Sequence, residues 1–391
     1  MTRVYFDNAA TTPISGVALA AYEAQIRKTG NPSSLHGFGR EVRKDLESAR
    51  ENLATIVGCH SSEIIFTGSG TEADNLAIKG IFWHRNSEDS KRNVIVISGF
   101  EHHAVLDPTR WLGENDGAEI IEIPISRSGK LDLEFLQSLV KNRGDEIALI
   151  SVMHVNNEIG TIQPIKKIVE IADQKSIPVH TDAVQSLGKV KVSFADLGVF
   201  AMTISAHKVG GPVGVGALIL KKGIEITPLL HGGGQERDIR SGTFNAPGIV
   251  AFVAAAQAAE RDREKNLLQV EKVREAFLKV LTESVSDFWI NGETESQIPA
   301  IINIGFPGTE SDSLLLLFDT EGIACSTGSA CSAGVQQPSH VLLALGLSEK
   351  EARSSLRFSF GLQNSMSDIE YFAACIPKVI ERARAAYKAS A

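Results

Sequence analysis

One lysine, Lys208, lies among small residues at the end of an apolar segment. The apolar residues 201–204 lead into Ser205-Ala206-His207-Lys208, and a glycine-rich segment, 210–216, follows. Glycines let the backbone pack closely around a bound group. A lysine in a tight pocket has a lowered pKa and can form a Schiff base. Most lysines are surface charges, but a solvated lysine has no need of glycine neighbours, so Lys208 is a candidate for covalent catalysis.

Two further segments offer groups that bind a charged ring or an anion. Asp182 follows the apolar run 178–181, at the kind of strand end where open α/β sheets bind ligands. A carboxylate there can pair with a protonated pyridine nitrogen and make the ring an electron sink, although Asp182 alone is more simply a helix N-cap. Segment 66–72, with Gly70 and Thr71, follows a strand and opens a helix, whose free N–H groups and dipole favour an anion. A strand-end Asp, a strand-end Lys and an anion site are together what pyridoxal 5'-phosphate (PLP) requires.

The four cysteines differ in their sequence context. Cys331 lies in segment 326–334, which contains only Ser, Thr, Gly, Ala and Cys, and a loop without bulky anchors is expected to be mobile. A cysteine that attacks a substrate and then presents sulfur to a partner needs such a tether. We expect Cys59 and Cys375 to be buried and inert, and Cys325 to be a core residue or, as the less favoured alternative, a resolving thiol. No zinc-type spacing of Cys or His occurs, so we predict no metal site.

Apolar and helical stretches alternate over residues 45–260. Short apolar runs between helices are typical of a mostly parallel sheet covered on both faces, and they occur at residues 64–66, 93–97, 147–152, 178–181, 201–204 and 216–220. The Ala-rich segment 249–281 predicts one long helix or two abutting helices. The elements beyond it indicate a smaller α+β lobe, with strands at 300–305, 323–326 and 355–360 and helices at 311–320 and from 367 onward.

The composition limits the classes of protein and partner. The 391 residues are 43% hydrophobic and 22% charged with a net charge of −8, which is ordinary for a globular protein and lacks the basic stripe of a nucleic-acid binder. No stretch approaches the ~18 apolar residues of a membrane helix. The N-terminus shows no leader segment and cysteines are sparse, so we expect a cytoplasmic protein without membrane or direct nucleic-acid contacts.

Several motifs occur together along the chain. They are Asp7-Asn8-Ala9-Ala10-Thr11-Thr12, Asn31-Pro32-Ser33-Ser34, Val155-Asn156-Asn157-Glu158-Ile159-Gly160, His180-Thr181-Asp182-Ala183, Ser205-Ala206-His207-Lys208, Arg240-Ser241-Gly242-Thr243 and Ser329-Ala330-Cys331. In this combination the whole chain resembles the cysteine desulfurases of the class V aminotransferase superfamily, and the context of the cysteine resembles the NifS/IscS type (group I). The resemblance implies an α/β protein with the PLP-dependent transferase fold type I. A large domain, 14–258, would carry a mostly parallel mixed sheet flanked by helices and bind PLP. A smaller α+β domain, 1–13 and 259–391, would carry the cysteine loop at about 326–335.

The resemblance also implies roles for individual residues toward the cofactor. Lys208 would hold PLP as a Schiff base and later move the Cα proton, Asp182 would pair with the pyridine nitrogen, and Gln185 would hydrogen-bond the phenolic oxygen. The groups that would bind the phosphate are Gly70, Thr71, Ser205, His207 and, across a homodimer interface, the partner subunit's Thr243.

Other positions would act on the substrate. His102 would stack on the ring and assist proton transfer, with the adjacent His103 as the alternative. Asn157 would contact both cofactor and substrate. Arg357 would bind the substrate carboxylate, because an arginine fork suits a carboxylate, although an ion pair is the alternative role. Cys331 would be the nucleophile.

The implied activity is removal of sulfur from L-cysteine, which gives L-alanine and a persulfide on Cys331. The sulfur would pass to an acceptor protein of iron–sulfur cluster or thiolation pathways. The alternatives are a selenocysteine lyase, another class V aminotransferase, or a non-enzymatic PLP-binding sulfur carrier or scaffold. Members that dock on iron–sulfur scaffolds often carry a longer C-terminal tail, and this sequence stops at Ala391, soon after its last predicted helix, so we expect a specialised acceptor.

Overall fold

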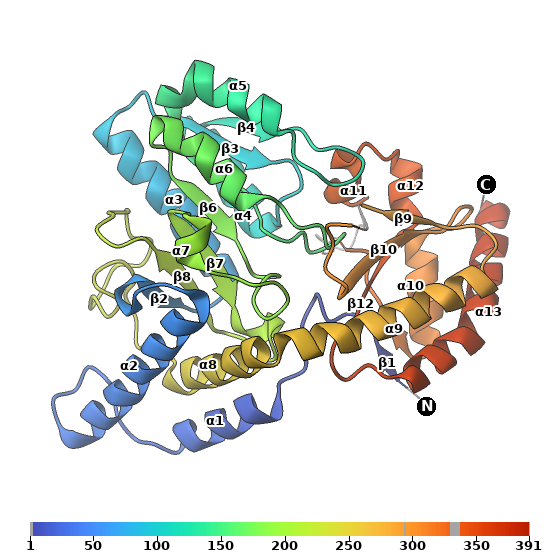
Figure 1. Ribbon diagram of the computed structural model, residues 1–391, viewed down its shortest axis with the longest axis horizontal. Coiled ribbons are helices and arrows are strands. Elements are labelled where there is room, and N and C mark those ends of the chain that lie inside the picture. Colours follow the sequence, from blue (N-terminus) through green and yellow to red (C-terminus); the bar gives the residue numbers. More distant parts are fainter. Residues whose placement is uncertain (1–2, 293–294, 329–336, 391) are drawn as a thin grey trace.

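The computed structural model describes residues 3–292, 295–328 and 337–390, and its largest element is a seven-stranded sheet (Figure 1). In spatial order the strands are β2 (Ile64–Thr67), β8 (Gly216–Leu220), β7 (Ala201–Ser205), β6 (Val179–Asp182), β5 (Ile147–Ser151), β3 (Val94–Ser98) and β4 (Glu119–Ile123). Strand β8 is antiparallel to both neighbours, and all other neighbouring strands are parallel. The predicted mostly parallel mixed sheet is confirmed.

Helices cover both faces of this sheet. Helices α3 (Gly70–Glu88) and α4 (His103–Asp116) share a core with one face. The other face packs against α2 (Gly37–Val57), α5 (Leu133–Arg143), α6 (Ile165–Ala172), the short α7 (Phe194–Leu197) and α8 (Ala246–Arg261). Helix α1 (Gly16–Ile26) lies against α8. Helix α2 illustrates the local cause, because buried Val42, Leu46, Leu53 and Val57 recur at helical spacing, and it ends at Gly58, whose φ of 67° suits glycine.

A second core lies beyond α8. It comprises the antiparallel sheet β12 (Ser355–Ser359), β10 (Ile301–Gly305) and β9 (Trp289–Asn291), the pair β1 (Val4–Tyr5) and β11 (Ile323–Ala324), and helices α9 (Arg263–Ser284), α10 (Ser311–Thr320) and α13 (Met366–Ser390). Helices α11 (His340–Ala344) and α12 (Glu349–Arg353) come late in the chain, but their buried residues pack into the core of the large sheet. Its centre is a cluster of phenylalanines: Phe6, Phe277, Phe318, Phe358, Phe360 and Phe372. The separate cores are consistent with two lobes, while the domain boundaries after residues 13 and 258 stay a prediction.

The long Ala-rich segment is two abutting helices, since α8 ends at Arg261 and α9 begins at Arg263. Figure 1 shows this pair running from one lobe into the other. Several short elements were not predicted, among them β4, whose two glutamates interrupt the apolar pattern at the sheet edge. Across the described part of the chain, no helix is both long and apolar enough to cross a membrane.

Candidate active site

Asp182 and Lys208 lie at the same edge of the large sheet. Asp182 is the last residue of β6, which pairs in parallel with β7, and Lys208 ends the 3₁₀ turn that directly follows β7. Parallel neighbours end at one edge, so their C-terminal residues come together. Each charge affects the other: Lys208 lowers the pKa of Asp182, and Asp182 raises the pKa of Lys208.

The Lys208 amine is held by the N-terminal segment. Its Nζ donates to the carbonyl oxygens of Ala9 at 2.7 Å and Ala10 at 2.9 Å. Burial, together with the nearby Arg357 charge, lowers its pKa to about 8. A substantial fraction of the amine is therefore neutral near physiological pH, as a nucleophile or base requires.

Further buried polar groups lie near Asp182. Asp182 accepts the backbone N–H of Val184 at 2.8 Å, and burial raises its pKa to about 6. The buried His180 ring lies 2.8 Å from the Ser151 hydroxyl, and its Nε2 lies 3.5 Å from an Asp74 carboxylate oxygen. Burial and the Asp182 charge raise the pKa of Asp74. Buried titratable groups thus extend from the site into the sheet.

The two adjacent histidines have different surroundings. His102 caps α4, its Nδ1 accepting a backbone N–H of the first turn. The residue keeps an exposed surface, yet desolvation by the surrounding protein and the Lys208 charge lower its pKa to about 4. His103 instead lies 3.1 Å from the Asp107 carboxylate, and its ring centroid is 4.9 Å from that of His340. Thus His102 lies within reach of the Lys208 charge, and the His103 ring lies against α11.

The start of α3 packs tightly against the sheet edge. A Cβ on Gly70 would lie 3.0 Å from a Val184 methyl carbon and 3.3 Å from the Ser205 Cβ, so the absence of a side chain permits this approach. Thr71 is exposed at the first turn, where free N–H groups point outward. The last two residues of the predicted phosphate site are less enclosed than Ser205: His207 is half-buried, and Thr243 is exposed.

Arg357 is a residue of the second lobe that contacts Asn157 and Asp7 beside the site. It is a buried residue of β12, and it donates to the Asn157 carbonyl oxygen at 3.0 Å and to an Asp7 carboxylate oxygen at 2.7 Å. The ion pair named as its alternative role therefore exists, with Asp7. Among the described residues, Nε of Arg357 and the side-chain oxygen of Asn157 are buried without a partner. Both are available to a ligand.

Two further predicted residues border Lys208. Gln185 is buried and donates through Nε2 to the Ala9 carbonyl oxygen at 2.9 Å. The His207 ring lies 3.3 Å from the Thr11 hydroxyl, and burial with the Lys208 charge lowers its pKa to about 4.

The cysteines divide as follows. Cys331 lies outside the described residues. Cys325 and Cys375 are buried and Cys59 is half-buried, so the expectation of burial is wrong for Cys59. Burial raises the pKa of all three described thiols, to about 12 for Cys59, which opposes thiolate formation.

These residues fit PLP. The partly neutral Lys208 amine suits an aldehyde, the Asp182 carboxylate suits a ring nitrogen, and the close-packed start of α3 suits a phosphate. The unpartnered Nε of Arg357 suits the carboxylate of an amino acid, and the unpartnered side-chain oxygen of Asn157 suits an N–H donor.

Several known proteins are similar to this chain in sequence and in fold. The sequence model of the family described as aminotransferase class-V matches residues 4–372. The IscS-like cysteine desulfurase of Mycobacterium tuberculosis (strain H37Rv) is 43% identical over 99% of this chain and 98% of its own length. A solved structure of a NifS-like protein superposes with a TM-score of 0.88 at 35% identity, covering 97% of this chain and 99% of that chain. The structure of SspA in complex with cysteine superposes with a TM-score of 0.81 at 33% identity, and the match covers 92% of this chain and 99% of that chain. The chain belongs to the class-V aminotransferase family and, within it, to the IscS- and NifS-like cysteine desulfurases.

Proposed function

We propose that this protein is a PLP-dependent cysteine desulfurase that converts L-cysteine to L-alanine and leaves the sulfur as a persulfide on Cys331. The observation that carries the proposal is the Lys208 amine, which is half-buried and partly neutral, near the Asp182 carboxylate and the His102 ring. The relatives named cysteine desulfurase, and the SspA structure that contains cysteine, support the choice of substrate.

The described residues have complementary roles in proton transfer. PLP, when bound, draws electrons from the bonds at the substrate Cα into its ring. With a pKa of about 6, Asp182 remains largely ionised at neutral pH and keeps the ring nitrogen protonated. The Lys208 Nζ takes the Cα proton in its neutral form, which prevails above about pH 8. His102, neutral because its pKa is near 4, covers the ring and relays protons.

The sulfur step belongs to Cys331. Its thiolate attacks the substrate sulfur, the Cβ–S bond breaks, and the electron pair of that bond stays with the carbon, which takes up a proton on the way to alanine. Arg357 and Asn157 hold the substrate carboxylate during this step and so orient Cβ–S. The described cysteines are unsuited to the role because their thiols have raised pKa values.

A single-turnover experiment tests the function. Purified holoenzyme is mixed with L-cysteine without reductant. Alanine is then measured, and the mass of the peptide that contains Cys331 is determined by mass spectrometry. One alanine per added sulfur on that peptide is expected, and Cys331→Ala is expected to retain bound PLP without forming alanine. Cys59→Ala is the matched control and should behave as wild type. PLP binding with neither persulfide nor alanine would refute the desulfurase proposal and direct attention to transamination or selenocysteine.

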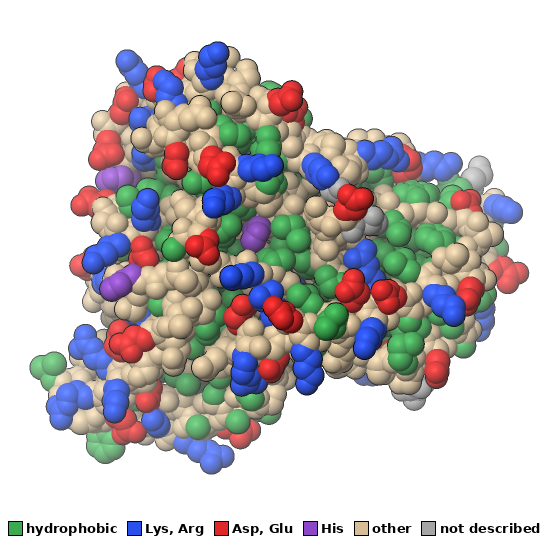
Figure 2. All heavy atoms as spheres, viewed as in Figure 1, with side chains coloured by type: hydrophobic (Ala, Val, Ile, Leu, Met, Phe, Trp, Pro, Cys, Tyr) green, Lys and Arg blue, Asp and Glu red, His purple; other side chains and the backbone are tan. Residues whose placement is uncertain are grey.

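We also propose a homodimer. Large apolar side chains are exposed on and near α1 and the start of α2: Val17, Leu19, Ile26, Leu35 and Phe38. Figure 2 shows hydrophobic side chains protruding at this end of the molecule. Exposed apolar clusters commonly mark interfaces, and a second copy would cover them and bring its exposed Thr243 to the phosphate. Sedimentation of wild type and Phe38→Asp tests this: a dimer that the charge dissociates is expected, and a wild-type monomer would refute it.

The final acceptor of sulfur is proposed to be a cytoplasmic protein of iron–sulfur cluster assembly or of a thiolation pathway. The names of the curated IscS relatives support sulfur transfer of this kind. Transfer of labelled sulfur from the Cys331 persulfide to acceptors co-purified from cytosol tests the proposal, and persulfide that no cytosolic protein accepts would refute it.

A further inference from the structure

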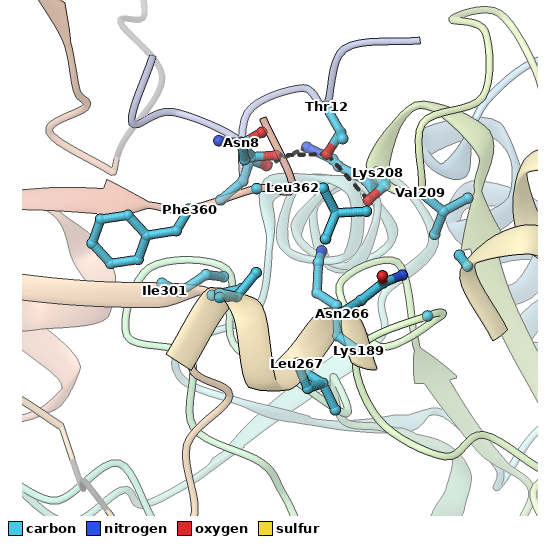
Figure 3. A pocket seen from close by; sticks show the side chains of 16 residues that line it. Asn8, Thr12, Lys189, Lys208, Val209, Asn266, Leu267, Ile301, Phe360 and Leu362 are labelled. Atoms are coloured by element: carbon cyan, nitrogen blue, oxygen red, sulfur yellow. Dashed lines mark hydrogen bonds between the residues drawn. The ribbon is translucent and has the colours of Figure 1, made fainter. Parts of the chain in front are cut away.

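A second lysine lies beside the site and has no role in the reaction described above. Lys189 follows Gln185 by four residues in the loop after β6, and its Nζ donates to the Gln185 side-chain oxygen at 2.7 Å. In Figure 3 the Lys189 side chain extends into a cavity of about 100 Å³ that it lines together with Asn8, Thr12 and Lys208. Burial and the charge of Lys208 lower the pKa of Lys189 to about 7.

The contacts of Gln185 define one orientation of its amide. Its oxygen accepts from Lys189, and its Nε2 donates to the Ala9 carbonyl oxygen at 2.9 Å. A flipped amide would turn its oxygen toward the Ala9 carbonyl, which pairs acceptor with acceptor, and its NH₂ toward the Lys189 amine, which pairs donor with donor when that amine is protonated. The Ala9 carbonyl also accepts from Lys208. The Gln185 NH₂ is therefore directed to the side on which Lys208 lies.

We propose that Lys189 is a positioning residue that fixes the Gln185 amide so that its NH₂, not its oxygen, faces the cofactor. The inference rests on the proposed function, in which Gln185 donates to the phenolic oxygen of PLP. Without Lys189 only the Ala9 contact opposes rotation of the amide, and an oxygen placed against the phenolic oxygen would repel it. The bond at 2.7 Å is charge-assisted when the amine is protonated, and it then adds to the Ala9 contact in setting the orientation of the amide.

The test compares Lys189→Met, Lys189→Arg and the control Lys191→Met, which removes an exposed lysine two residues away. Three quantities are measured: the dissociation constant of PLP from apoprotein, the absorption maximum of bound PLP, and the Gln185–Ala9 contact in crystals of the apoprotein. Lys189→Met is expected to weaken PLP binding about tenfold, shift the absorption maximum and lose the contact. Lys189→Arg is expected to stay within about threefold of wild type, because the cavity leaves room for the larger donor.

A double-variant experiment distinguishes a role of Lys189 in positioning the Gln185 amide from a role in overall stability. In a Gln185→Ala background, Lys189→Met is expected to add no further loss of PLP affinity, and urea unfolding of Lys189→Met is expected to match wild type, since Met fills similar space at this half-buried position. Equal losses in both backgrounds, or an unmoved Gln185 amide in the Lys189→Met crystals, would overturn the proposal. The crystals of apoprotein decide about Lys189 even if wild type fails to bind PLP or to form alanine, results that would refute only the proposed function.

Discussion

Breaking the buried ion pair between Arg50 and Glu236 is expected to destabilise the large lobe strongly. Two bonds join the side chains, at 2.9 and 3.0 Å, and only 8% of Arg50 and 1% of Glu236 is exposed. Glu236 also precedes Arg237 and Asp238, whose φ values of 55° and 60° are unfavourable for residues with a Cβ. The pair thus anchors a strained segment onto α2.

The magnitude follows from the burial of the charges. Arg50→Met leaves a buried carboxylate without its main partner, a loss that typically costs about 3–5 kcal/mol. Arg237 also lowers the pKa of Glu236 and would partly compensate, so we expect about 3 kcal/mol. Replacing both partners by apolar residues, Arg50→Met with Glu236→Leu, is expected to recover most of that loss, because no unpaired charge remains.

Urea unfolding of the apoprotein, followed by tryptophan fluorescence, measures both variants. PLP affinity is measured in parallel, because the same segment continues to Arg240, which pairs with Glu72 in the first turn of α3 at 2.8 Å. The reasoning would be refuted if Arg50→Met cost less than about 1 kcal/mol, as an exposed pair does. A double variant as unstable as the single one would refute it equally.

Three other perturbations test different parts of the site. The rate of alanine formation by wild type is expected to rise with pH up to about 8 and then level off, because Lys208 acts as a base in its neutral form; a rate that falls over this range in a stopped-flow series would contradict it. Gly216→Ala is expected to weaken PLP binding at least tenfold, because its Cβ would lie 2.6 Å from the Ser69 carbonyl carbon at the start of α3; unchanged affinity by equilibrium dialysis would contradict it. Burial raises the pKa of Glu101 to about 8, so its contribution to stability is present below the usual ~4.3 of an unfolded carboxyl and is lost as pH rises through 8. Glu101→Gln is expected to flatten that decline in urea unfolding, and an unchanged slope would show that the carboxyl does not titrate there.

The placement of Asp182 and Lys208 could be predicted because it needs only local information. Each follows a short apolar run, and parallel strands bring their C-terminal ends to one edge whatever the rest of the chain does. The helix after Gly70 was equally predictable from its glycines and its position after β2. Edge strand β4 was missed because Glu119 and Glu122 interrupt its isoleucines, so it lacks the continuous apolar run of a central strand.

The remaining contacts of the site depend on the register of distant segments. Arg357 and Asp7 are 350 residues apart, and they meet because β12 pairs with the N-terminal segment at the bridge between Asp7 and Ser359. The Lys189–Gln185 bond is local, and its four-residue spacing was visible, but the spacing did not show that the amine lies in a cavity shared with Lys208. The burial of Lys189 and Lys208 depends on which distant segments pack against them, and this burial sets the pKa of each amine.

The proposed role of Arg357 would require both lobes before the site can select an amino acid. Asp7 and the Asn157 carbonyl occupy two of its nitrogens, and these contacts fix the guanidinium plane before any substrate arrives. A side chain already held in place loses little conformational freedom on binding, so more of the interaction with a carboxylate remains as affinity. Its Nε and the Asn157 side-chain oxygen, both buried and unpartnered within the described chain, come from different lobes. One offers a donor for a carboxylate and the other an acceptor for an N–H group, so the proposed recognition of an amino acid would take place where the two lobes meet.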